Sequence, residues 1–279
     1  LEMHVWLITV NYGDPAPTAS LLESLQACQK NTLTIKMGIA DNASQSTNYN
    51  KLNKLKTDSD IEIELFPFSI NYFYWPAANQ VINKMLAING SYPDWVMVCN
   101  NDITFQDSNF FNKLEKIDLR EYPILGPEII GKNTRLPLNP FMVKPMSAIK
   151  RLYWKLFYTS FTFSRLLLIS KKIRDRLFYY NNQSKTHGPL PVYAVHGAAI
   201  LFSKHFFDKG GWLDDNFSLY GEELTVAEIA KQVGCPVTFN PELKLIHQEH
   251  TSTQKMDQRS IFNKARESHR YVMSKYIDK

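Results

Sequence analysis

The sequence of 279 residues lacks most of the features by which a protein's chemistry is usually recognised. No charge-free apolar stretch reaches about 18 residues, and no basic region precedes an apolar core near its start, so we expect neither a membrane span nor a secretory signal. No P-loop, dinucleotide glycine fingerprint or nucleophile elbow occurs, which leaves NTPase, NAD-dependent and covalent mechanisms without support. Three cysteines lie far apart and match no metal spacing, which favours a reducing, cytoplasmic setting over a disulfide scaffold: Cys28, Cys99 and Cys235.

Basic charge is scarce over most of the chain and concentrated in one segment. Of the 32 Lys and Arg residues, nine lie within 144–176, where Asp175 is the single acid, so the local balance is +8. The other 23 basic and 26 acidic residues leave the body at −3, although the whole chain has a formal net charge of +5. A nucleic-acid binder normally carries positive charge across a folded face, so this distribution argues against that function.

Strand and helix patterns alternate through the first hundred residues. Short apolar and β-branched runs predict strands, and stretches with apolar residues on one side predict the helices between them. Such alternation is typical of an α/β protein whose mostly parallel sheet is covered by helices on both faces. The expected strands cover 4–10, 33–40, 61–65 and 94–99, and the expected helices cover 18–28, 47–56 and 76–88.

The second half of the chain is less regular. Proline and glycine predict loops with short strands over 123–145, and a strand over 192–202 is interrupted at His196-Gly197-Ala198. The motif Tyr220-Gly-Glu-Glu223 opens a predicted helix that ends near Val233. The remaining expected elements are two short strands, 236–240 and 243–246, and a basic helix over 259–276.

Polar residues follow three of the predicted strands at their carboxyl ends. Open α/β sheets bind ligands along this edge, so three clusters on one rim indicate a ligand site more strongly than any one of them. Each cluster alone could be an ordinary strand end, because strands finish in turn-forming residues. The clusters are Asn11-Tyr12, Asp41-Asn42 and Asn100-Asn101-Asp102.

Three positions could carry chemistry, and each also has a purely structural interpretation. Asp102, beside a carbonyl-bearing neighbour, could hold a divalent cation against a diphosphate or could simply end a strand. Glu222-Glu223 suits the dipole of a helix N-terminus, but a partly desolvated pair also suits a general base for a hydroxyl. His247 could complete the cation site, contact a phosphate or support the strand end alone.

Taken in order, these motifs resemble the family 2 glycosyltransferases, enzymes of the GT-A fold that transfer sugars from nucleotide-sugars. The similarity covers most of 5–252 apart from the basic segment, and points to bacterial enzymes of O-antigen and capsule polysaccharide synthesis, the rhamnosyltransferase-like branch included. Order and spacing carry it: Val10-Asn11-Tyr12, Asp41-Asn42-Ala43-Ser44, Asn71 with Asn79, Asn100-Asn101-Asp102 in the place of a DXD motif, His196-Gly-Ala-Ala-Ile-Leu-Phe-Ser203, Gly210-Gly-Trp-Leu-Asp-Asp-Asn-Phe217, Tyr220-Gly-Glu-Glu223, Gly234, and His247 with Ser252.

The resemblance implies a donor site and a metal site. Val10, Asn11 and Asp41 would line a pocket for base and ribose, with Asp41 receiving a polar edge of the base. Asp102 would hold Mg²⁺ or Mn²⁺ on the diphosphate of a UDP-, dTDP- or GDP-linked sugar, and His247 would approach the metal or the phosphates. The other residues implied at the donor are Tyr12, Asn42, Asn71, Asn79 and Asn101.

The same resemblance implies a single displacement with inversion at the anomeric carbon. Glu223 would be the base that takes the proton of an acceptor hydroxyl, and Glu222 would help to orient the substrate. The acceptor would be an oligosaccharide or a lipid-linked glycan. Four residues would lie on the sugar and acceptor side, the first two through their backbone and the third by stacking: Gly197, Ala198, Trp212 and Asp215.

The sequence departs from the family's pattern at four positions. Phe73 stands where relatives usually have a glycine, and Asn100 replaces the first acid of the DXD motif, which leaves one carboxylate for the metal. Thr225 stands where an aspartate is frequent, and Glu223 replaces the more usual aspartate with a longer side chain. These departures motivate a second hypothesis, a non-catalytic GT-A-like protein that acts as a membrane-associated partner or scaffold.

The basic segment has an apolar, aromatic centre over 156–170, interrupted by Arg165 and flanked by Lys and Arg. This pattern favours one or two helices lying in the interface of an anionic membrane, at the inner face of the cell membrane. A core helix with a solvated basic face is the alternative, and the basic residues could also bind an acceptor's diphosphate.

We therefore expect a GT-A fold with a basic amphipathic helical insertion. Residues 3–135 would form the nucleotide-sugar half, 136–190 the insertion, 191–258 the acceptor-binding and catalytic half, and 259–279 a C-terminal helix. A sugar nucleotidyltransferase also fits the alternating sheet, but the basic glycine-rich loop of such enzymes is missing.

Overall fold

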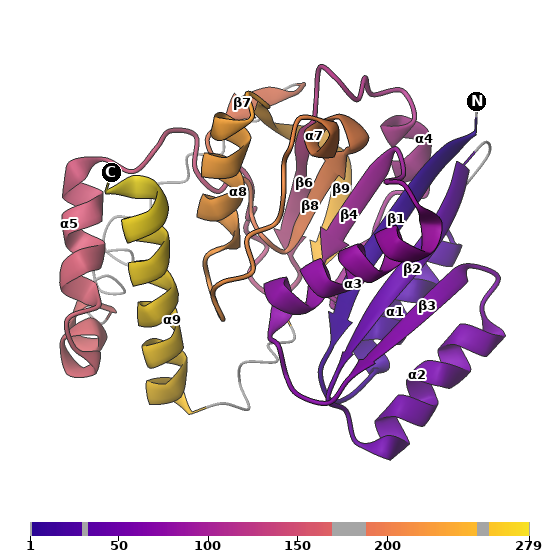
Figure 1. Cartoon of the computed structure of the whole chain (residues 1–279), viewed down its shortest axis with the longest axis horizontal. Helices are drawn as coiled ribbons and strands as arrows, with labels where there is room; N and C mark the ends of the chain where they lie inside the picture. Colours follow the sequence, from indigo (N-terminus) through magenta and orange to yellow (C-terminus); the bar gives the residue numbers. More distant parts are fainter. Residues whose placement is uncertain (1, 30–32, 169–187, 250–256, 279) are drawn as a thin grey trace.

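The computed structural model describes residues 2–29, 33–168, 188–249 and 257–278 (Figure 1). Ser252 and residues 169–176 of the basic segment, both singled out above, lie outside these ranges. Within them, one sheet has the strand order β3-β2-β1-β4-β8-β6-β9-β5, and β7 pairs with β9. The strands are β1 (Met3–Asn11), β2 (Leu33–Asn42), β3 (Glu62–Phe68), β4 (Trp95–Cys99), β5 (Ile103–Phe105), β6 (Ile124–Gly131), β7 (Leu190–Val192), β8 (Ala199–Ser203) and β9 (Val237–His247).

Helices cover both faces of this sheet (Figure 1). Buried residues of α1 and α4, with α2 alongside, pack on one face, and those of α3, α7 and α8 pack on the other. Residues 161–168 are also helical. The helices are α1 (Ala16–Gln26), α2 (Ser46–Asp58), α3 (Tyr74–Asn89), α4 (Phe110–Leu114), α5 (Ala148–Phe157), α7 (Lys204–Asp208), α8 (Glu222–Gln232) and α9 (Gln258–Val272), which continues as a π-helical turn, Met273–Ile277.

The alternation of side chains along the central strands creates the two cores. In β1, Val5 and Leu7 belong to the core beneath α1, whereas Trp6 and Ile8 belong to the core beneath α3. Because successive side chains of a strand point to opposite faces, a strand in the middle of the sheet must be apolar throughout. This is why β1 and β4 read as continuous apolar runs in the sequence.

The α/β fold class is confirmed, and the sheet is purely parallel only in its first half. The pairs β1–β2, β2–β3 and β1–β4 are parallel, as the strand–helix alternation predicts. Beyond β4 the strands are mixed: β8 is antiparallel to both β4 and β6, β9 is parallel to β6, and β5 and β7 are antiparallel to β9. The periodicity of single strands carries no information on this pairing, which depends on the path of the loops.

Two predicted details of the second half are wrong. The region 123–145, expected as loop with short strands, contains the eight-residue strand β6, which lies between β8 and β9. The two short strands expected at 236–240 and 243–246 form one strand, β9, whose register against β6 shifts between Pro127 and Glu128. A β-bulge of this kind places extra residues in one strand and mimics a strand end in the sequence.

Helix α5 and helix α9 lie side by side, apart from the sheet (Figure 1). Aromatic rings join them, and Arg151 of α5 makes an ion pair of 3.5 Å with Asp278 at the end of the chain. The C-terminal part of α9 is fixed to the body by Asp214, whose carboxylate accepts hydrogen bonds from the hydroxyls of Tyr271 and Tyr276. The two helices therefore form a third layer beside the carboxyl end of β4.

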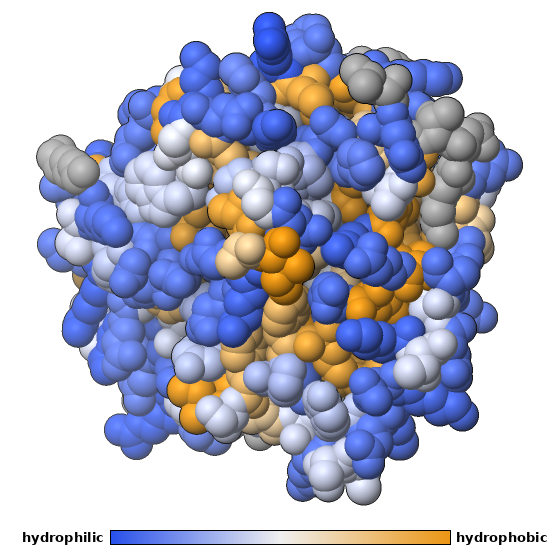
Figure 2. Space-filling view, turned by 45° about the vertical axis from the view of Figure 1, so that its right-hand side comes forward, coloured by the Kyte–Doolittle hydropathy of each residue, from blue (hydrophilic) through white to orange (hydrophobic). Residues whose placement is uncertain are grey.

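The surface differs between the body and this layer. On the face of the molecule in Figure 2, hydrophilic side chains cover most of the surface, and apolar ones gather in an irregular band between them. On α5, the side chains of Ile149, Leu152 and Leu156 are exposed, by 82% in the case of Ile149. None of the helices in the described ranges has the length and hydropathy needed to cross a bilayer.

Candidate active site

Side chains at the carboxyl ends of β1 and β4 form one buried hydrogen-bonded cluster. Thr18, in the first turn of α1, donates to Asn11 Oδ1 at 2.7 Å, and Asn101 Nδ2 donates to Thr18 Oγ1 at 3.1 Å. Asn11 also donates to the Gly13 carbonyl at 3.2 Å. The polar residues that follow β1 and β4 therefore meet through Thr18. We call the residues Asn11, Asp41, Asn101, Asp102 and His247 the strand-end rim.

Asp41 lies beside this cluster because the parallel register of β1 and β2 pairs it with Asn11. Its carboxylate is buried, and the Oδ1 atom has no hydrogen-bond partner among the described residues. Burial raises the pKa of Asp41, and hydrogen bonds from Ser44 oppose part of this effect. A buried acceptor without a partner is costly, so this oxygen is a candidate for a ligand's N–H or O–H group.

Asn42 and Phe73 shape the loop that follows β3. Asn42 Nδ2 donates to the Phe73 carbonyl at 2.9 Å, and its Oδ1 accepts from the Tyr72 amide at 3.1 Å. Asn71 Oδ1 accepts from the Phe73 amide at 2.8 Å. Phe73 has φ 63° and ψ −169°, a conformation that glycine adopts without strain. The loop at Phe73 thus has a glycine-like backbone despite its phenylalanine.

Asp102 and His247 meet because β5 pairs with β9 in a register that places Ile103 opposite His247. The His247 Nε2 atom lies 3.1 Å from Asp102 Oδ1 and 3.3 Å from Asn100 Nδ2. Asp102 is buried, and no cluster of three or more His, Cys, Asp or Glu ligands occurs in the part of the chain that the structure describes. One carboxylate and one imidazole fit a cation that takes its other ligands from phosphate and water, as Mg²⁺ and Mn²⁺ do.

Glu222 and Glu223 begin helix α8 beside the turn at Gly197. The Gly197 amide donates to Glu223 Oε1 at 3.1 Å, and the Gly221 amide donates to Glu222 Oε2 at 2.9 Å. A Cβ atom at Gly197 would lie 2.4 Å from Glu222 Cγ, so only glycine permits this approach. Burial, reinforced by the charge of Glu223, raises the pKa of Glu222 to about 7, and burial also raises the pKa of Glu223.

The sequence interpretation named His196 in a strand interruption and in a family motif, but gave its side chain no role; it lines the cavity described below. Its Nδ1 accepts from the Ala198 amide at 3.0 Å, its own amide donates to Asn139 Oδ1 at 2.7 Å, and its ring meets Phe141 edge-on. Burial lowers the pKa of His196 to about 4, so the imidazole is neutral at pH 7 with Nδ1 unprotonated. A neutral ring held in this way offers an N–H donor at Nε2.

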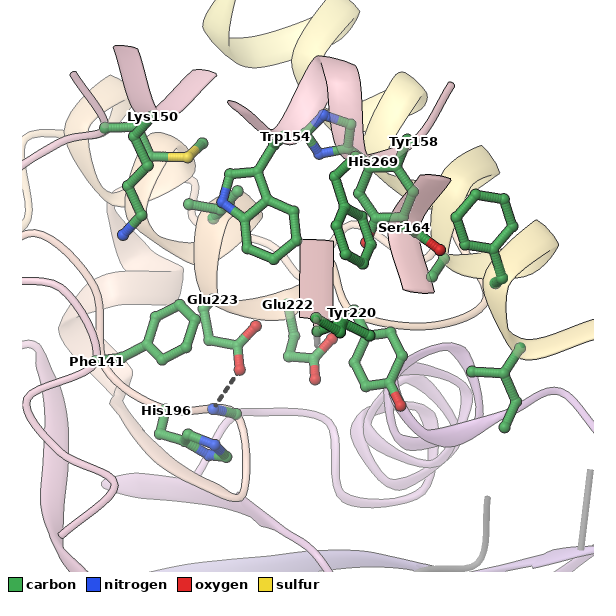
Figure 3. Close-up of a pocket in the computed structure, with 18 of the residues that line it drawn as sticks. Phe141, Lys150, Trp154, Tyr158, Ser164, His196, Tyr220, Glu222, Glu223 and His269 are labelled. Carbon is green, nitrogen blue, oxygen red and sulfur yellow. Dashed lines mark hydrogen bonds between the residues drawn. The ribbon is translucent and has the colours of Figure 1, made fainter. Parts of the chain in front are cut away.

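Glu222, Glu223 and His196 border a cavity of about 840 Å³ between the sheet edge and the layer of α5 and α9. Figure 3 shows Glu222, Glu223 and His196 on one side of it, and Trp154, Tyr158 and His269 on the opposite side. The Asn100 amide donates to the Ala198 carbonyl at 2.9 Å, which joins the strand-end rim to this cavity. A molecule in the cavity could therefore contact the carboxylates of Glu222 and Glu223 while a second molecule lies at the rim.

Several predicted site residues lie apart from this centre. Asn79 Nδ2 donates to Asp215 Oδ2 at 3.0 Å, so both side chains satisfy each other. Trp212 and Tyr12 are each 40% exposed, and neither lines the cavity. Val10 is buried at the end of β1. Asp214, next to the predicted Asp215, is buried and anchors α9. The sequence around the two aspartates does not show which of them has this role.

Comparisons with known proteins match this chain at the level of the fold. No family model matches the sequence, and no curated protein matches it either. Among solved structures, GalNAc-T7 with UDP, GalNAc and Mn²⁺ superposes with a TM-score of 0.63 at 12% identity, over 100% of this chain and 49% of that one. S. aureus TarS 1–349 with UDP-GlcNAc gives 0.60 at 10% identity, over 98% of this chain and 67% of that one.

A third similar structure is the mannosyltransferase PcManGT from Pyrobaculum calidifontis in complex with GDP-Man and Mn²⁺. Its TM-score is 0.53 at 9% identity, over 98% of this chain and 70% of that one. In a further TarS 1–349 structure, this chain spans 60% of the length of the protein that it matches. At such low identity the likeness concerns the fold alone, and it confirms that this chain has the GT-A fold.

Proposed function

We propose that this protein is an inverting, metal-assisted glycosyltransferase that moves a sugar from a nucleotide-sugar to a glycan acceptor. The observation that carries the proposal is the half-buried pair Glu222 and Glu223, which faces a cavity beside the strand-end rim. A base for the acceptor and a polar site for the donor thus lie at adjacent positions. The resemblance to family 2, and to enzymes of O-antigen and capsule synthesis, supports the same reaction.

Residues of the strand-end rim would hold the donor. The unpartnered Oδ1 atom of Asp41 would accept a hydrogen bond from the base, and the cluster of Asn11 and Asn101 would border the ribose. Asp102 and His247 would hold Mg²⁺ or Mn²⁺, which neutralises the charge that develops on the departing diphosphate. TarS and PcManGT were solved with UDP-GlcNAc and with GDP-Man respectively, so a UDP-, GDP- or dTDP-linked donor is proposed here without a choice of base.

The carboxylate pair would provide the base. The carboxylates of Glu222 and Glu223 interact, and a second negative charge is costly in a partly desolvated site, so the pair would favour a state with one proton. Because the pKa of Glu222 is raised to about 7, Glu222 would carry this proton in about half of the molecules at pH 7, and Glu223 would then be the ionised partner. Glu223 would take the proton of the acceptor hydroxyl. The hydroxyl oxygen would form a bond to the anomeric carbon as the bond between that carbon and the diphosphate breaks on the opposite face.

A thermal-shift panel with UDP, GDP and dTDP, each with and without Mn²⁺, tests the donor site. We expect one nucleotide to raise the melting temperature, and the rise to be larger with Mn²⁺. The variant Asp102→Asn should lose the Mn²⁺ dependence, and Asp58→Asn, an exposed carboxylate on α2, should keep it. If no nucleotide shifts the melting temperature, the non-catalytic hypothesis is favoured, in agreement with Asn100 in the place of an acid.

The outer face of α5 supports peripheral binding to an anionic membrane as part of the proposal. Ile149, Leu152 and Leu156 form an exposed apolar stripe, and Arg151 and Lys155 lie beside it. Apolar side chains next to basic ones suit insertion at the level of lipid headgroups. The double variant Leu152→Ser, Leu156→Ser should sediment less with vesicles of phosphatidylglycerol; unchanged sedimentation would contradict this part of the proposal.

A further inference from the structure

A three-residue turn, from His196 to Ala198, connects the two polar regions of the candidate site. Toward the strand-end rim, the Asn100 amide donates to the Ala198 carbonyl at 2.9 Å. Toward helix α8, the Gly197 amide donates to Glu223 Oε1 at 3.1 Å. All of these residues line the cavity. A substrate that extends from the rim to the carboxylate pair would therefore lie over this turn.

The backbone of the turn is fixed by residues outside it. The buried side chain of Asn139 accepts a hydrogen bond from the His196 amide at 2.7 Å and donates to the Pro127 carbonyl at 2.8 Å. The Tyr74 hydroxyl donates to the Gly197 carbonyl at 3.0 Å. A side chain that contacts a substrate is most selective when its own position is held by such supporting bonds. The fold thus fixes the position of the His196 backbone from both sides of the turn.

The imidazole of His196 has one polar atom that is free to bind a ligand. Its Nδ1 accepts from the Ala198 amide at 3.0 Å, so the proton of the neutral ring lies on Nε2. The ring is neutral at pH 7, because burial lowers its pKa to about 4. No described residue forms a hydrogen bond with Nε2, and the ring lines the cavity (Figure 3). His196 therefore offers a fixed N–H donor and has no free nitrogen that could act as a base.

His196 lies within electrostatic range of both ends of the site. Burial lowers the pKa of His196 most, the charge of Glu222 opposes this effect, and the charge of His247 adds to it. In the proposed reaction, the diphosphate of the donor lies at Asp102 and His247, and the anomeric carbon faces Glu223. The sugar of the donor would then lie between these groups, over the turn that carries His196.

We infer that His196 contacts the transferred sugar and donates a hydrogen bond from Nε2 to one of its hydroxyl or carbonyl oxygens. His196 is then a specificity-determining residue for the sugar of the donor and not for its nucleotide. This inference rests on the proposed function for the reaction and the donor class. The resemblance to family 2 implies contacts from this turn only through the backbone of Gly197 and Ala198, so the side chain of His196 is an addition.

The neutral state of the ring favours an uncharged oxygen as its partner. Phosphate oxygens bind cationic donors roughly twice as strongly as neutral ones, so a neutral N–H gives little advantage to a diphosphate. A hydroxyl or amide carbonyl of a sugar is satisfied by a neutral donor, and Glu223 does not repel it as it would repel an anion. A sugar without an oxygen at this place would leave the partly buried N–H unpaired, which is a source of specificity.

Titration calorimetry with Mn²⁺ tests the inference without any need for turnover. Each nucleoside diphosphate is compared with a nucleotide-sugar of the same base: UDP with UDP-GlcNAc, GDP with GDP-Man, and dTDP with dTDP-glucose. The pair that the wild type binds is then measured in His196→Asn, which can still accept from the Ala198 amide but has no donor at the position of Nε2. The affinity for the nucleotide-sugar should fall about tenfold, whereas that for the nucleoside diphosphate should stay within about twofold.

The variant His196→Gln makes the opposite change. Its longer amide can place an N–H group near the position of Nε2, but it cannot accept from the Ala198 amide as Nδ1 does. This variant should keep more affinity for the nucleotide-sugar than His196→Asn, and it should lose more thermal stability. A purely structural role would reduce both quantities together in both variants. The control is His205→Asn in α7, which does not line the cavity and should change neither quantity.

The inference and the proposed function fail in different ways. A wild type that binds none of the three nucleoside diphosphates would overturn the proposed function, and the role of His196 with it. A wild type whose affinity for the nucleotide-sugar is unchanged in His196→Asn would overturn the inference alone. Equal losses of affinity for both members of the pair would also overturn it, as would a wild type that binds the nucleoside diphosphate but not the nucleotide-sugar.

Discussion

The strand-end rim lies beside the cavity, and the aromatic wall lines it; the wall consists of Trp154, Phe157, Tyr158, Phe161, Phe262 and His269. The two regions are built in different ways. The rim residues follow strand ends, and their positions are set by backbone pairing, as in the register that places Asp41 beside Asn11. The wall depends on contacts between side chains of α5 and α9, more than one hundred residues apart in sequence. We conclude that the fold itself fixes the rim, whereas packing between two helices fixes the wall.

The largest expected effect concerns the carboxylate pair between these two regions. Glu223→Gln keeps the hydrogen bond from the Gly197 amide but removes the group that can accept a proton, so kcat should fall by about 10²- to 10⁴-fold. Nucleotide affinity should not change, because Glu223 belongs to the cavity and not to the rim. Kinetics with a glycan acceptor, together with nucleotide titration, measure both quantities.

Glu228→Gln is the matched control on the same helix. Tyr193 donates to Glu228 Oε1 at 2.6 Å, and a glutamine can still accept this bond. Its kcat should equal that of the wild type. Comparable losses in both variants would mean that the substitutions disturb α8 as a whole, and the assignment of Glu223 as the base would then be wrong.

The next effect concerns the link between the wall and the body. Burial opposes ionisation of Asp214, but hydrogen bonds from Tyr276, Asn216 and Tyr271 prevail and lower its pKa to about 2 from the usual 3.8. This shift corresponds to about 2 kcal/mol of stability at neutral pH. Asp214→Asn should reduce the free energy of unfolding by at least about this amount and should loosen the attachment of α9.

The pH dependence gives the sign of this contribution. Because the pKa of Asp214 is lower in the folded chain, its stabilisation is fully present above the unfolded value of about 3.8 and is lost as the pH falls towards 2. The difference between the wild type and Asp214→Asn in urea unfolding should thus be constant above about pH 5 and shrink below pH 4. A difference that persists at pH 2 would contradict the ionic role, and Asp208→Asn, an exposed change, should show no difference at any pH.

This contrast also explains what the sequence could and could not predict. Strand ends can be located from apolar runs, so Asn11, Asp41 and Asp102 were placed correctly on one edge, and the structure unites Asp102 with His247. The cavity could not be predicted, because no local pattern tells which helix packs against 148–157. His196 and Asp214 were missed for the same reason: a buried histidine and a buried anchor acquire their roles only from distant partners.

A smaller effect is expected at the rim itself. Asp41→Asn exchanges one carboxylate oxygen for an NH₂ group, which cannot accept a hydrogen bond from a nucleotide base. Nucleotide affinity should fall about tenfold, the effect of one lost charged hydrogen bond. Stability should be unchanged or higher, because burial already raises the pKa of Asp41 and so disfavours its charge in the absence of ligand.

Titration calorimetry and thermal unfolding of Asp41→Asn measure these two quantities, and Asp14→Asn at the exposed start of α1 serves as the control. Lower affinity together with unchanged or higher stability would place the unpartnered oxygen in the donor site. Lower stability with unchanged affinity would show that Asp41 supports the fold. Asp41 would then no longer count as a donor-binding residue of the rim.

The smallest expected effect concerns the loop after β3, and tests whether the backbone of Phe73 is strained. Phe73→Ala and Phe73→Gly both remove the ring that lies 4.7 Å from Lys264 Nζ, so the comparison between them isolates the backbone. Glycine normally destabilises a folded chain relative to alanine, by about 0.5–1 kcal/mol. At φ 63° and ψ −169° the order should reverse, with Phe73→Gly more stable than Phe73→Ala by about 1 kcal/mol in urea unfolding, because alanine keeps the Cβ that disfavours this conformation. If Phe73→Ala were the more stable variant, the loop would relax when the ring is removed. The loop beside the rim would then depend on side-chain packing, as the aromatic wall does.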